Sequence, residues 1–189
     1  VHAYGGKAVW ANVSHAYHHH AKVHTVEHTQ LLLMQGVAAR CSPNVIELNA
    51  LDDSRDGYEG LRDAMRQVRW ASDALKGCEP VKYAAVLHSR VSEQSGDDAF
   101  QSSVAGVYDL LAYQHIPFEF VSERSVLEDR LQGFSVLVIP NATHLGTPTL
   151  EAIESFVSGG GGLVASYRSG RFDESGGRRE NNPILELAG

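Results

Sequence analysis

The chain has 189 residues, of which 43% are hydrophobic and 21% are charged, and its formal net charge at pH 7 is −7. A chain of this length is long enough for one large hydrophobic core or two small ones. No stretch approaches the ~20 apolar residues of a membrane-spanning helix. The negative net charge argues against a nucleic-acid partner, because binding to a phosphate backbone is favoured by an excess of Lys and Arg. We therefore expect neither a membrane nor a nucleic acid as a partner.

Strand and helix patterns alternate over the first 80 residues. A candidate strand runs from Ala8 to Val13, and an almost uniformly apolar stretch at 28–41 predicts a helix that is buried on most sides. A second strand is predicted at 44–51, and an amphipathic helix follows from its cap Ser54 to Lys76. The apolar stripe of that helix consists of Tyr58, Leu61, Met65, Val68 and Leu75. Two such units cannot close a core, so we expect a fragment of a larger protein, such as the end of a β/α barrel.

From Val81 onward, apolar runs predict buried strands at 81–89, 118–122, 134–140 and 162–167. Helices are predicted between them from apolar residues that recur at steps of three and four. These residues are Phe100, Val104, Val107 and Leu111, then Leu127 and Leu131, then Leu150, Ile153, Phe156 and Val157, with Pro148 in the first turn of the last helix. The alternating order requires a parallel sheet with helices on both faces. A flavodoxin-like doubly wound α/β sheet is its natural form.

The stretch HAYHHHAKVHTVEH, from His15 to His28, holds six of the ten histidines. Its end, with His24, Glu27 and His28, matches the H-x-x-E-H pattern of one group of zinc peptidases. A zinc site also needs a third ligand from elsewhere, and three fixed residues match easily by chance in a histidine-rich window. We therefore predict no metal and no cofactor, and a zinc hydrolase using these three residues is a remote alternative. Exposed or structural roles fit the loop from Ser14 to His24 better, and contact with carbohydrate is the next interpretation.

Neither the glycine run Gly159–Gly162 nor the cysteines predict a site. A phosphate-binding loop places its glycines after a strand and before a helix, whereas this run follows a predicted helix and precedes a strand. We interpret the run as a helix stop and a tight turn. Cys41 and Cys78 form no CxxC pair and no disulfide framework, which favours a reducing, cytoplasmic compartment without establishing it.

The stretches FSVLVIPNATHL (134–145) and AIESFVSGGGGLVASYRSGRFDESG (152–176) resemble the trimerisation domain of family 42 β-galactosidases and their hypothetical glycosyl hydrolase relatives. The most specific part is the order of Gly-Gly, Leu-Val, Ser166-Tyr167, Ser169-Gly170 and Asp173-Glu174. The resemblance implies the fold of class I glutamine amidotransferases. It also implies an assembly module behind a catalytic (β/α)8 barrel, and association as a homotrimer.

The resemblance divides the chain into two domains. Residues 1–79 would be the C-terminal units of the barrel, because KAVWANVS is similar to the seventh barrel strand and NVIELNALD to the eighth. Residues 80–189 would be the trimerisation domain, truncated before its sheet is complete.

Two departures from the family pattern affect the expected activity. The seventh strand of these glycosidases ends in a nucleophilic Glu, but Trp10 to Ser14 supply no carboxylate. Active amidotransferases place a Cys at a sharp turn after the strand that matches GLVASY, and here Tyr167 stands near that position. Without a thiolate, glutamine hydrolysis has no nucleophile. We therefore predict no catalytic residue in this chain.

Loops at the carboxyl ends of parallel strands meet at one edge of a sheet, where ligands of doubly wound folds bind. The loops concerned are 89–98, 141–146 and 168–177. We expect six residues to converge there, at a vestigial pocket or a subunit contact: Ser89, Asn141, His144, Arg168, Asp173 and Glu174. Internal pairing of Arg168 and Arg171 with the two carboxylates of the same loop is the alternative.

These observations favour the C-terminal part of a glycoside-hydrolase-like protein with a noncatalytic assembly domain. The parent protein would hydrolyse or bind glycosides, so its substrate would be a carbohydrate. The isolated chain is expected not to cleave sugars, because it lacks most of the barrel and any identifiable carboxylate pair. A small-molecule-binding or assembly module with no enzymatic parent is the alternative.

Overall fold

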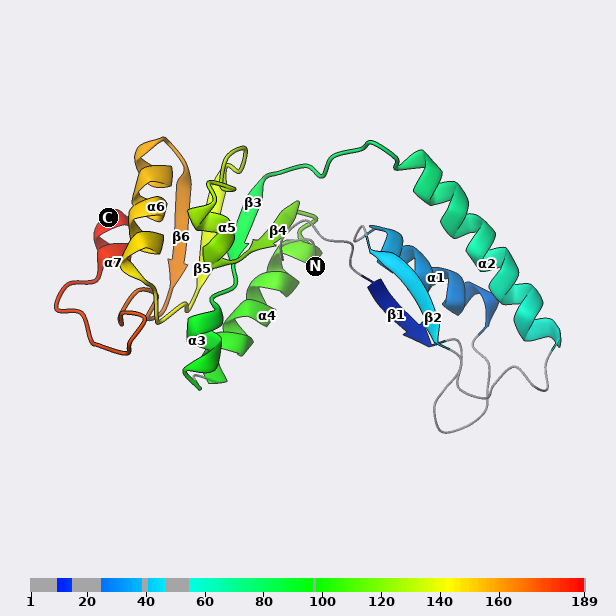
Figure 1. Ribbon diagram of the computed structural model, residues 1–189, viewed down its shortest axis with the longest axis horizontal. Helices are drawn as coiled ribbons and strands as arrows, with labels where there is room; N and C mark the ends of the chain where they lie inside the picture. The colour runs from blue at the N-terminus through cyan, green and yellow to red at the C-terminus, as the bar shows by residue number, and fades with distance from the viewer. Residues whose placement is uncertain (1–9, 15–24, 39–40, 47–54, 97, 189) are drawn as a thin grey trace. The chain divides into compact units, whose positions relative to one another are not determined.

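The chain forms two compact units that divide between Glu79 and Pro80 (Figure 1). The computed structural model describes residues 10–14, 25–38, 41–46, 55–96 and 98–188. Each unit has its own cluster of buried apolar residues. None of the helices in these ranges is both long and apolar enough to cross a membrane.

The first unit has the order β-α-β-α. Its elements are β1 (Trp10–Ser14), α1 (Val26–Ala38), β2 (Ser42–Ile46) and α2 (Arg55–Ala74). Strands β1 and β2 pair in parallel, with Asn12 opposite Asn44, and α1 supplies the crossover that a parallel pair needs. Strand β1 begins at Trp10 rather than at Ala8, and β2 begins two residues before Asn44. Residues 47–51 of the second predicted strand lie outside the described residues.

Helices α1 and α2 pack through branched apolar side chains and alanines, and the predicted apolar stripe of α2 is only partly correct, since Val68 is its buried member. The buried cluster consists of Leu33 and Val37 from α1 and Ala64, Val68 and Ala71 from α2. Met65 and Leu75, which were predicted to face the core, are 40% and 45% exposed, and Leu31 is 58% exposed, so α1 is not buried on most sides. A Cβ added at Gly60 would lie 2.6 Å from Val26 Cγ2. The two helices therefore approach too closely at that point for a larger residue.

The second unit is built on a four-stranded sheet in the order β4-β3-β5-β6. The strands are β3 (Ala84–Leu87), β4 (Phe118–Val121), β5 (Val136–Pro140) and β6 (Gly162–Ser166). Every neighbouring pair is parallel, which confirms the predicted parallel sheet. All four residues of β3 are buried, as expected for an interior strand covered on both faces.

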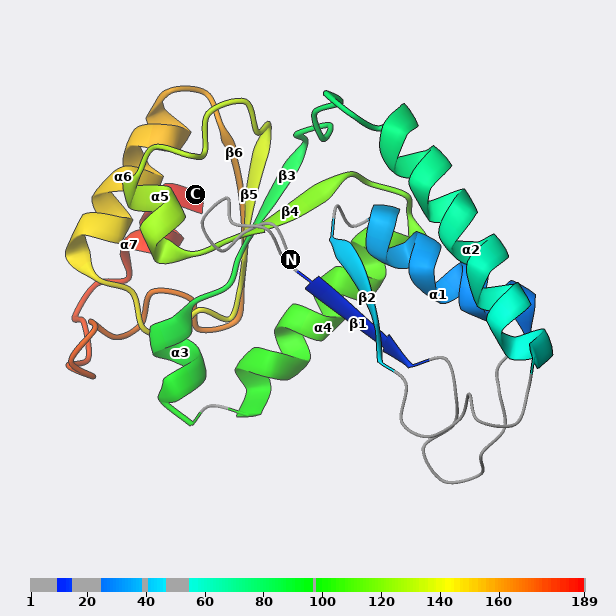
Figure 2. The same ribbon diagram turned by 45° about the vertical axis from the view of Figure 1, so that its right-hand side comes forward.

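Helices cover both faces of this sheet, with α4 on one side and α5, α6 and α7 on the other (Figure 2). The helices are α3 (Arg90–Gln94), α4 (Asp98–Tyr113), α5 (Glu123–Leu127), α6 (Thr147–Ser158) and α7 (Pro183–Ala188). The side chains of Ser89 and Ser122 cap α3 and α5, because each hydroxyl accepts a hydrogen bond from the backbone N–H of the residue three positions later. Pro148 lies in the first turn of α6, as predicted.

The predicted apolar stripe of α4 is confirmed, since Phe100, Val104 and Leu111 are buried in the core of the second unit. The prediction for α5 is wrong in one respect. This helix ends at Leu127, which is 52% exposed, while Leu131 is buried in the turn that follows. Asp129 adopts a left-handed conformation with φ 58°, which ends the helix before the two leucines can share a face.

Candidate functional site

The carboxyl ends of the four parallel strands lie at one edge of the sheet of the second unit. Ser89 follows β3, Ser122 follows β4, Asn141 follows β5 and Tyr167 follows β6. Strands β3 and β5 are neighbours although β4 lies between them in the sequence. The chain order reverses between β3 and β5, and this switch point is where doubly wound folds open a ligand crevice.

At the switch point, the two strand-end loops are joined by hydrogen bonds between buried groups. Ser89 and Ser92 have no exposed surface. The Ser89 hydroxyl donates to Ser92 Oγ (2.9 Å), and the Ser92 hydroxyl donates to the carbonyl oxygen of His144 (3.2 Å). The backbone N–H of His144 donates back to Ser92 Oγ over 3.0 Å. The polar groups that would line a crevice here are therefore used to hold its two sides together.

Asn141 links the end of β5 to the end of β6. It is fully buried and adopts a left-handed φ of 48°, a conformation that asparagine tolerates better than most residues. Its backbone N–H donates to Ser166 Oγ (3.1 Å), and its side-chain Oδ1 accepts from the backbone N–H of Arg168 (3.3 Å). The candidate residues Asn141 and Arg168 are thus in direct contact, as the convergence of strand ends predicts.

Tyr167 occupies the sharp turn after β6, at φ 55°, and its side chain is 67% exposed. The Arg168 guanidinium lies 4.7 Å from the centre of the Tyr167 ring, and Arg168 Nη2 donates to Tyr167 Oη over 2.8 Å. Cys41 precedes β2 and Cys78 follows α2, so neither cysteine lies at this strand end. The turn therefore carries the phenol of Tyr167 and no thiol group.

The loop after Tyr167 returns to the end of β5 and contacts His144. The His144 ring stacks on Phe172 with centroids 5.0 Å apart, and the backbone N–H of Leu145 donates to the Phe172 carbonyl oxygen (3.1 Å). Arg179 Nη2 donates to the carbonyl oxygen of Leu145 over 2.8 Å. These contacts fix the loop by stacking and by backbone hydrogen bonds.

Asp173 stabilises the tip of the same loop. Its Oδ1 accepts hydrogen bonds of 2.8 Å from the backbone N–H groups of Gly177 and Ser175, and these bonds hold the pKa of the carboxyl below its usual value. Glu174 is exposed. Within the described part of the chain, no ion pair joins Arg168 or Arg171 to either carboxylate of this loop. The alternative of internal ion pairing is therefore wrong, because Arg168 stacks on Tyr167 and Asp173 binds backbone.

The six candidate residues consequently fall into two groups. Ser89 and Asn141 are buried, and His144 and Asp173 are partly covered and hold the loops in place. Arg168 and Glu174 present their charges to solvent. The network is completed by Ser92 in α3, Ser166 at the end of β6 and Ser169 in the turn after it, none of which was predicted as a site residue.

A cavity of about 650 Å³ lies at the opposite ends of β5 and β6, between the ends of α5 and α6. Its lining residues are Val126, Leu127, Asp129, Leu131–Ser135, Ala152, Ser155, Phe156 and Gly159–Gly161. Gly159 caps α6 and Gly160 adopts φ 97°, so the glycine run serves as the predicted helix stop and turn. A Cβ added at Gly161 would lie 2.3 Å from the Phe156 ring, so any larger residue there would force the ring to move.

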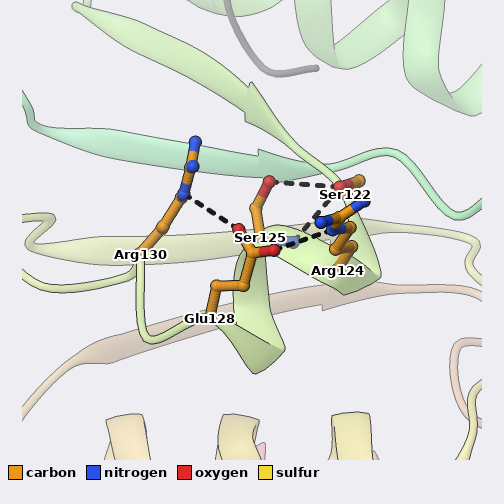
Figure 3. Close-up of polar contacts among 5 residues, drawn as sticks. All are labelled: Ser122, Arg124, Ser125, Glu128 and Arg130. Carbon is orange, nitrogen blue, oxygen red and sulfur yellow. Dashed lines mark hydrogen bonds and ion pairs between the residues drawn. The ribbon is translucent and has the colours of Figure 1, made fainter. Parts of the chain in front are cut away.

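A small ion-pair network joins α5 to the turn that follows it (Figure 3). Arg124 Nε lies 2.7 Å from Glu128 Oε1, and Arg130 Nε lies 3.3 Å from Glu128 Oε2. The hydrogen bond from Arg124 holds the pKa of Glu128 below its usual value. All three side chains are solvent-exposed, so the network contributes little to stability.

The predicted histidine-rich loop and His24 lie outside the described residues. Glu27 and His28 are exposed near the start of α1. Among the described residues, no group of three or more His, Cys, Asp or Glu is placed to hold a metal ion.

The same arrangement of helices and strands occurs in solved family 42 enzymes. A catalytic mutant of a family 42 β-galactosidase from G. stearothermophilus is similar with a TM-score of 0.68 and 15% identity, covering 84% of this chain and 26% of that chain. A family 42 exo-carrageenase from Bacteroides ovatus gives 0.65 and 11%, covering 87% and 26%. The β-galactosidase from Rahnella sp. R3 gives 0.62 and 21%, covering 87% and 28%. At these identities the likeness shows a shared fold.

The sequence itself matches the family described as the β-galactosidase trimerisation domain over residues 75–183, which is more than half of the chain. The chain belongs to this family. It spans about a quarter of the length of the solved relatives. No curated protein matches it.

Proposed function

We propose that the chain is the C-terminal part of a glycoside-hydrolase-related protein and that its second unit is a noncatalytic assembly domain. One observation carries this proposal. The strand-end edge, where an amidotransferase would hold its thiolate, is closed by the Ser89–Ser92–His144 hydrogen bonds and carries Tyr167. Such an edge offers no thiolate for glutamine hydrolysis, which supports a role in assembly for a domain of the trimerisation family.

We further propose that residues 80–189 have the doubly wound, flavodoxin-like fold of class I glutamine amidotransferases. The strand order supports this assignment, because the second strand lies on one side of the first and the third lies on the other. Residues 1–79 are proposed to be the last units of a (β/α)8 barrel. The parallel β1–β2 pair with its crossover helix supports that assignment.

The proposed assembly is a homotrimer, and the parent protein is proposed to act on a carbohydrate. Arg168 and Glu174 are the candidate residues that offer exposed charge to another copy. Ser89, Asn141, His144 and Asp173 are assigned the supporting role of holding the strand-end loops.

The experiment is light scattering coupled to size exclusion over a hundredfold concentration range, with assays for glutamine hydrolysis and for cleavage of nitrophenyl glycosides. We expect a mass of three copies at high concentration and no turnover in either assay. A solved family 42 β-galactosidase serves as the positive control for glycoside cleavage. A monomer at every concentration contradicts the assembly role, and turnover by this chain contradicts the noncatalytic assignment.

The cavity between α5 and α6 favours small-molecule binding as the second candidate function, because its volume of about 650 Å³ suits a small ligand. Its lining combines the Phe156 ring with the polar side chains of Asp129 and Gln132. Thermal unfolding in the presence of galactose or lactose tests this candidate. A rise in the midpoint that disappears in Ala152→Trp, which fills the cavity, supports binding, and no rise with either sugar rejects these ligands.

A further inference from the structure

Tyr167 combines a strained backbone conformation with an exposed aromatic side chain. Its φ of 55° is an outlier for a bulky residue, since the left-handed region crowds Cβ against the backbone. Its ring is also 67% exposed, so the strained position does not bury an aromatic side chain. The exposed His115 also adopts a left-handed φ, of 53°, so these two features alone assign no role. Tyr167 differs from it because the Arg168 guanidinium is held on its ring and hydroxyl.

The base of the turn is rigid. Ser169 is 3% exposed, and its Oγ lies 3.0 Å from the carbonyl oxygen of Ile139 and 2.9 Å from that of Ser166. Asn182 Nδ2 donates to the Ser169 carbonyl oxygen over 2.9 Å. These buried contacts over-determine the backbone, which is the condition under which a strained conformation survives.

The tip of the turn is pre-organised as well. The Arg168 guanidinium is held over the Tyr167 ring at 4.7 Å and bonded to its hydroxyl at 2.8 Å. A side chain that is already ordered loses less entropy when a partner binds it. Tyr and Arg are also the residue types that most often dominate the binding energy of protein interfaces.

We propose that Tyr167 and Arg168 form the anchor through which one copy of this chain contacts another. The inference rests on the proposed assembly function and names the residues that carry it. A second copy is the occupant, because the matched family is described as a trimerisation domain. Charge supports it as well, since 23 Asp and Glu against 16 Lys and Arg make carboxylates the commoner charged partner for a guanidinium on another copy.

The test compares association and folding in the same variants of the 189-residue chain. Tyr167→Gly removes the ring and relieves the backbone, because glycine adopts positive φ without a penalty. We expect the dissociation constant of the assembly, from sedimentation equilibrium, to rise at least tenfold while the melting midpoint of the dissociated chain stays equal or rises. Arg168→Ala should weaken association in the same direction.

His115→Gly is the matched control, since His115 is an exposed residue with φ 53° at the end of α4. It relieves the same kind of strain and should leave the dissociation constant unchanged. Equal association of Tyr167→Gly and the unmodified chain overturns the anchor and leaves the assembly function intact. If Tyr167→Gly fails to fold, Arg168→Ala decides, because unchanged association of that variant also overturns the anchor. A monomeric unmodified chain overturns both proposals.

Discussion

The Ser92 hydroxyl lies 3.2 Å from the carbonyl oxygen and 3.0 Å from the amide nitrogen of His144, so one buried side chain satisfies both backbone groups of a residue 52 positions away. Because Ser92 lies in the first turn of α3 and His144 lies between β5 and α6, this contact fastens α3 to the loop after β5 at the edge of the sheet. Buried backbone groups are costly to leave unpaired.

Replacing this serine tests how much the closed edge contributes. We expect Ser92→Ala to lower the free energy of unfolding by about 1–3 kcal/mol, because it removes the acceptor of the His144 backbone N–H and of the Ser89 hydroxyl. The His144 carbonyl oxygen keeps a donor, since Ser89 Oγ lies 3.3 Å from it. Urea unfolding followed by circular dichroism measures the change. Ser103→Ala removes a hydroxyl that bonds only within α4 and should change stability by less than about 0.5 kcal/mol. Equal effects of the two variants would show that the edge is not held by Ser92.

The glycines at 161 and 106 should respond to alanine in opposite directions. A Cβ at Gly161 would lie 2.3 Å from the Phe156 ring, so Gly161→Ala forces the ring to move and should cost about 1–3 kcal/mol. Gly106 lies in the middle of α4 with no atom within 4 Å of an added Cβ. Gly106→Ala should therefore stabilise the chain by about 0.5–1 kcal/mol. Thermal midpoints of the two variants, measured side by side, check both signs.

The lowered pKa of Asp173 predicts that the free energy of unfolding decreases at acidic pH. Backbone N–H groups of Gly177 and Ser175 hold the pKa of its carboxyl below the unfolded value, so the unfolded chain binds more protons than the folded chain in the window between the two. The stabilisation is present above the unfolded pKa of ~3.9 and is lost as the pH falls through the lowered folded pKa. Stability should therefore fall between about pH 5 and pH 2.

Asp173→Asn removes this titration, because the amide carries no proton equilibrium in that range. We expect its urea midpoints, measured from pH 7 to pH 2, to fall less steeply than those of the unmodified chain. Ser175→Ala, in the same exposed loop, changes no titrating group and is the control, so its midpoints should follow those of the unmodified chain at every pH. Parallel profiles for the unmodified chain and Asp173→Asn would rule out the proposed backbone contacts of this carboxylate.

The architecture of the second unit follows from local patterns, whereas much of its detail depends on distant contacts. Apolar runs with helical stripes between them predict a parallel sheet, and the stripe at Phe100, Val104 and Leu111 is buried as its spacing indicates. The periodicity was only partly correct for α2: Val68 is buried as predicted, but Met65 is exposed, because Ala64 and Gly60 also lie where the two helices meet. Hydrophobicity alone does not reveal where two helices come closest.

In the candidate site, too, some contacts follow from the predicted topology and others depend on residues far apart in the sequence. The carboxyl ends of parallel strands share an edge, so the contact between Asn141 and Arg168 follows from the topology. The burial of Ser89 and its link to His144 depend on two loops far apart in the sequence, and no local pattern specifies their meeting. The left-handed conformation of Tyr167 is equally invisible in the sequence, because tyrosine gives no sign of positive φ.

Of the four strands of its sheet, β3 is synthesised first, although it lies in the interior of the finished sheet. Its neighbours β4 and β5 begin only at Phe118 and Val136. At a synthesis rate of about 5–20 residues per second, the Ala84–Leu87 segment waits on the order of seconds for the strands that will flank it. Two of its four residues are alanines, so the nascent chain exposes less apolar surface during this delay than it would with larger apolar residues. Larger apolar residues at those two positions would enlarge the surface exposed during this delay and so favour aggregation of the nascent chain.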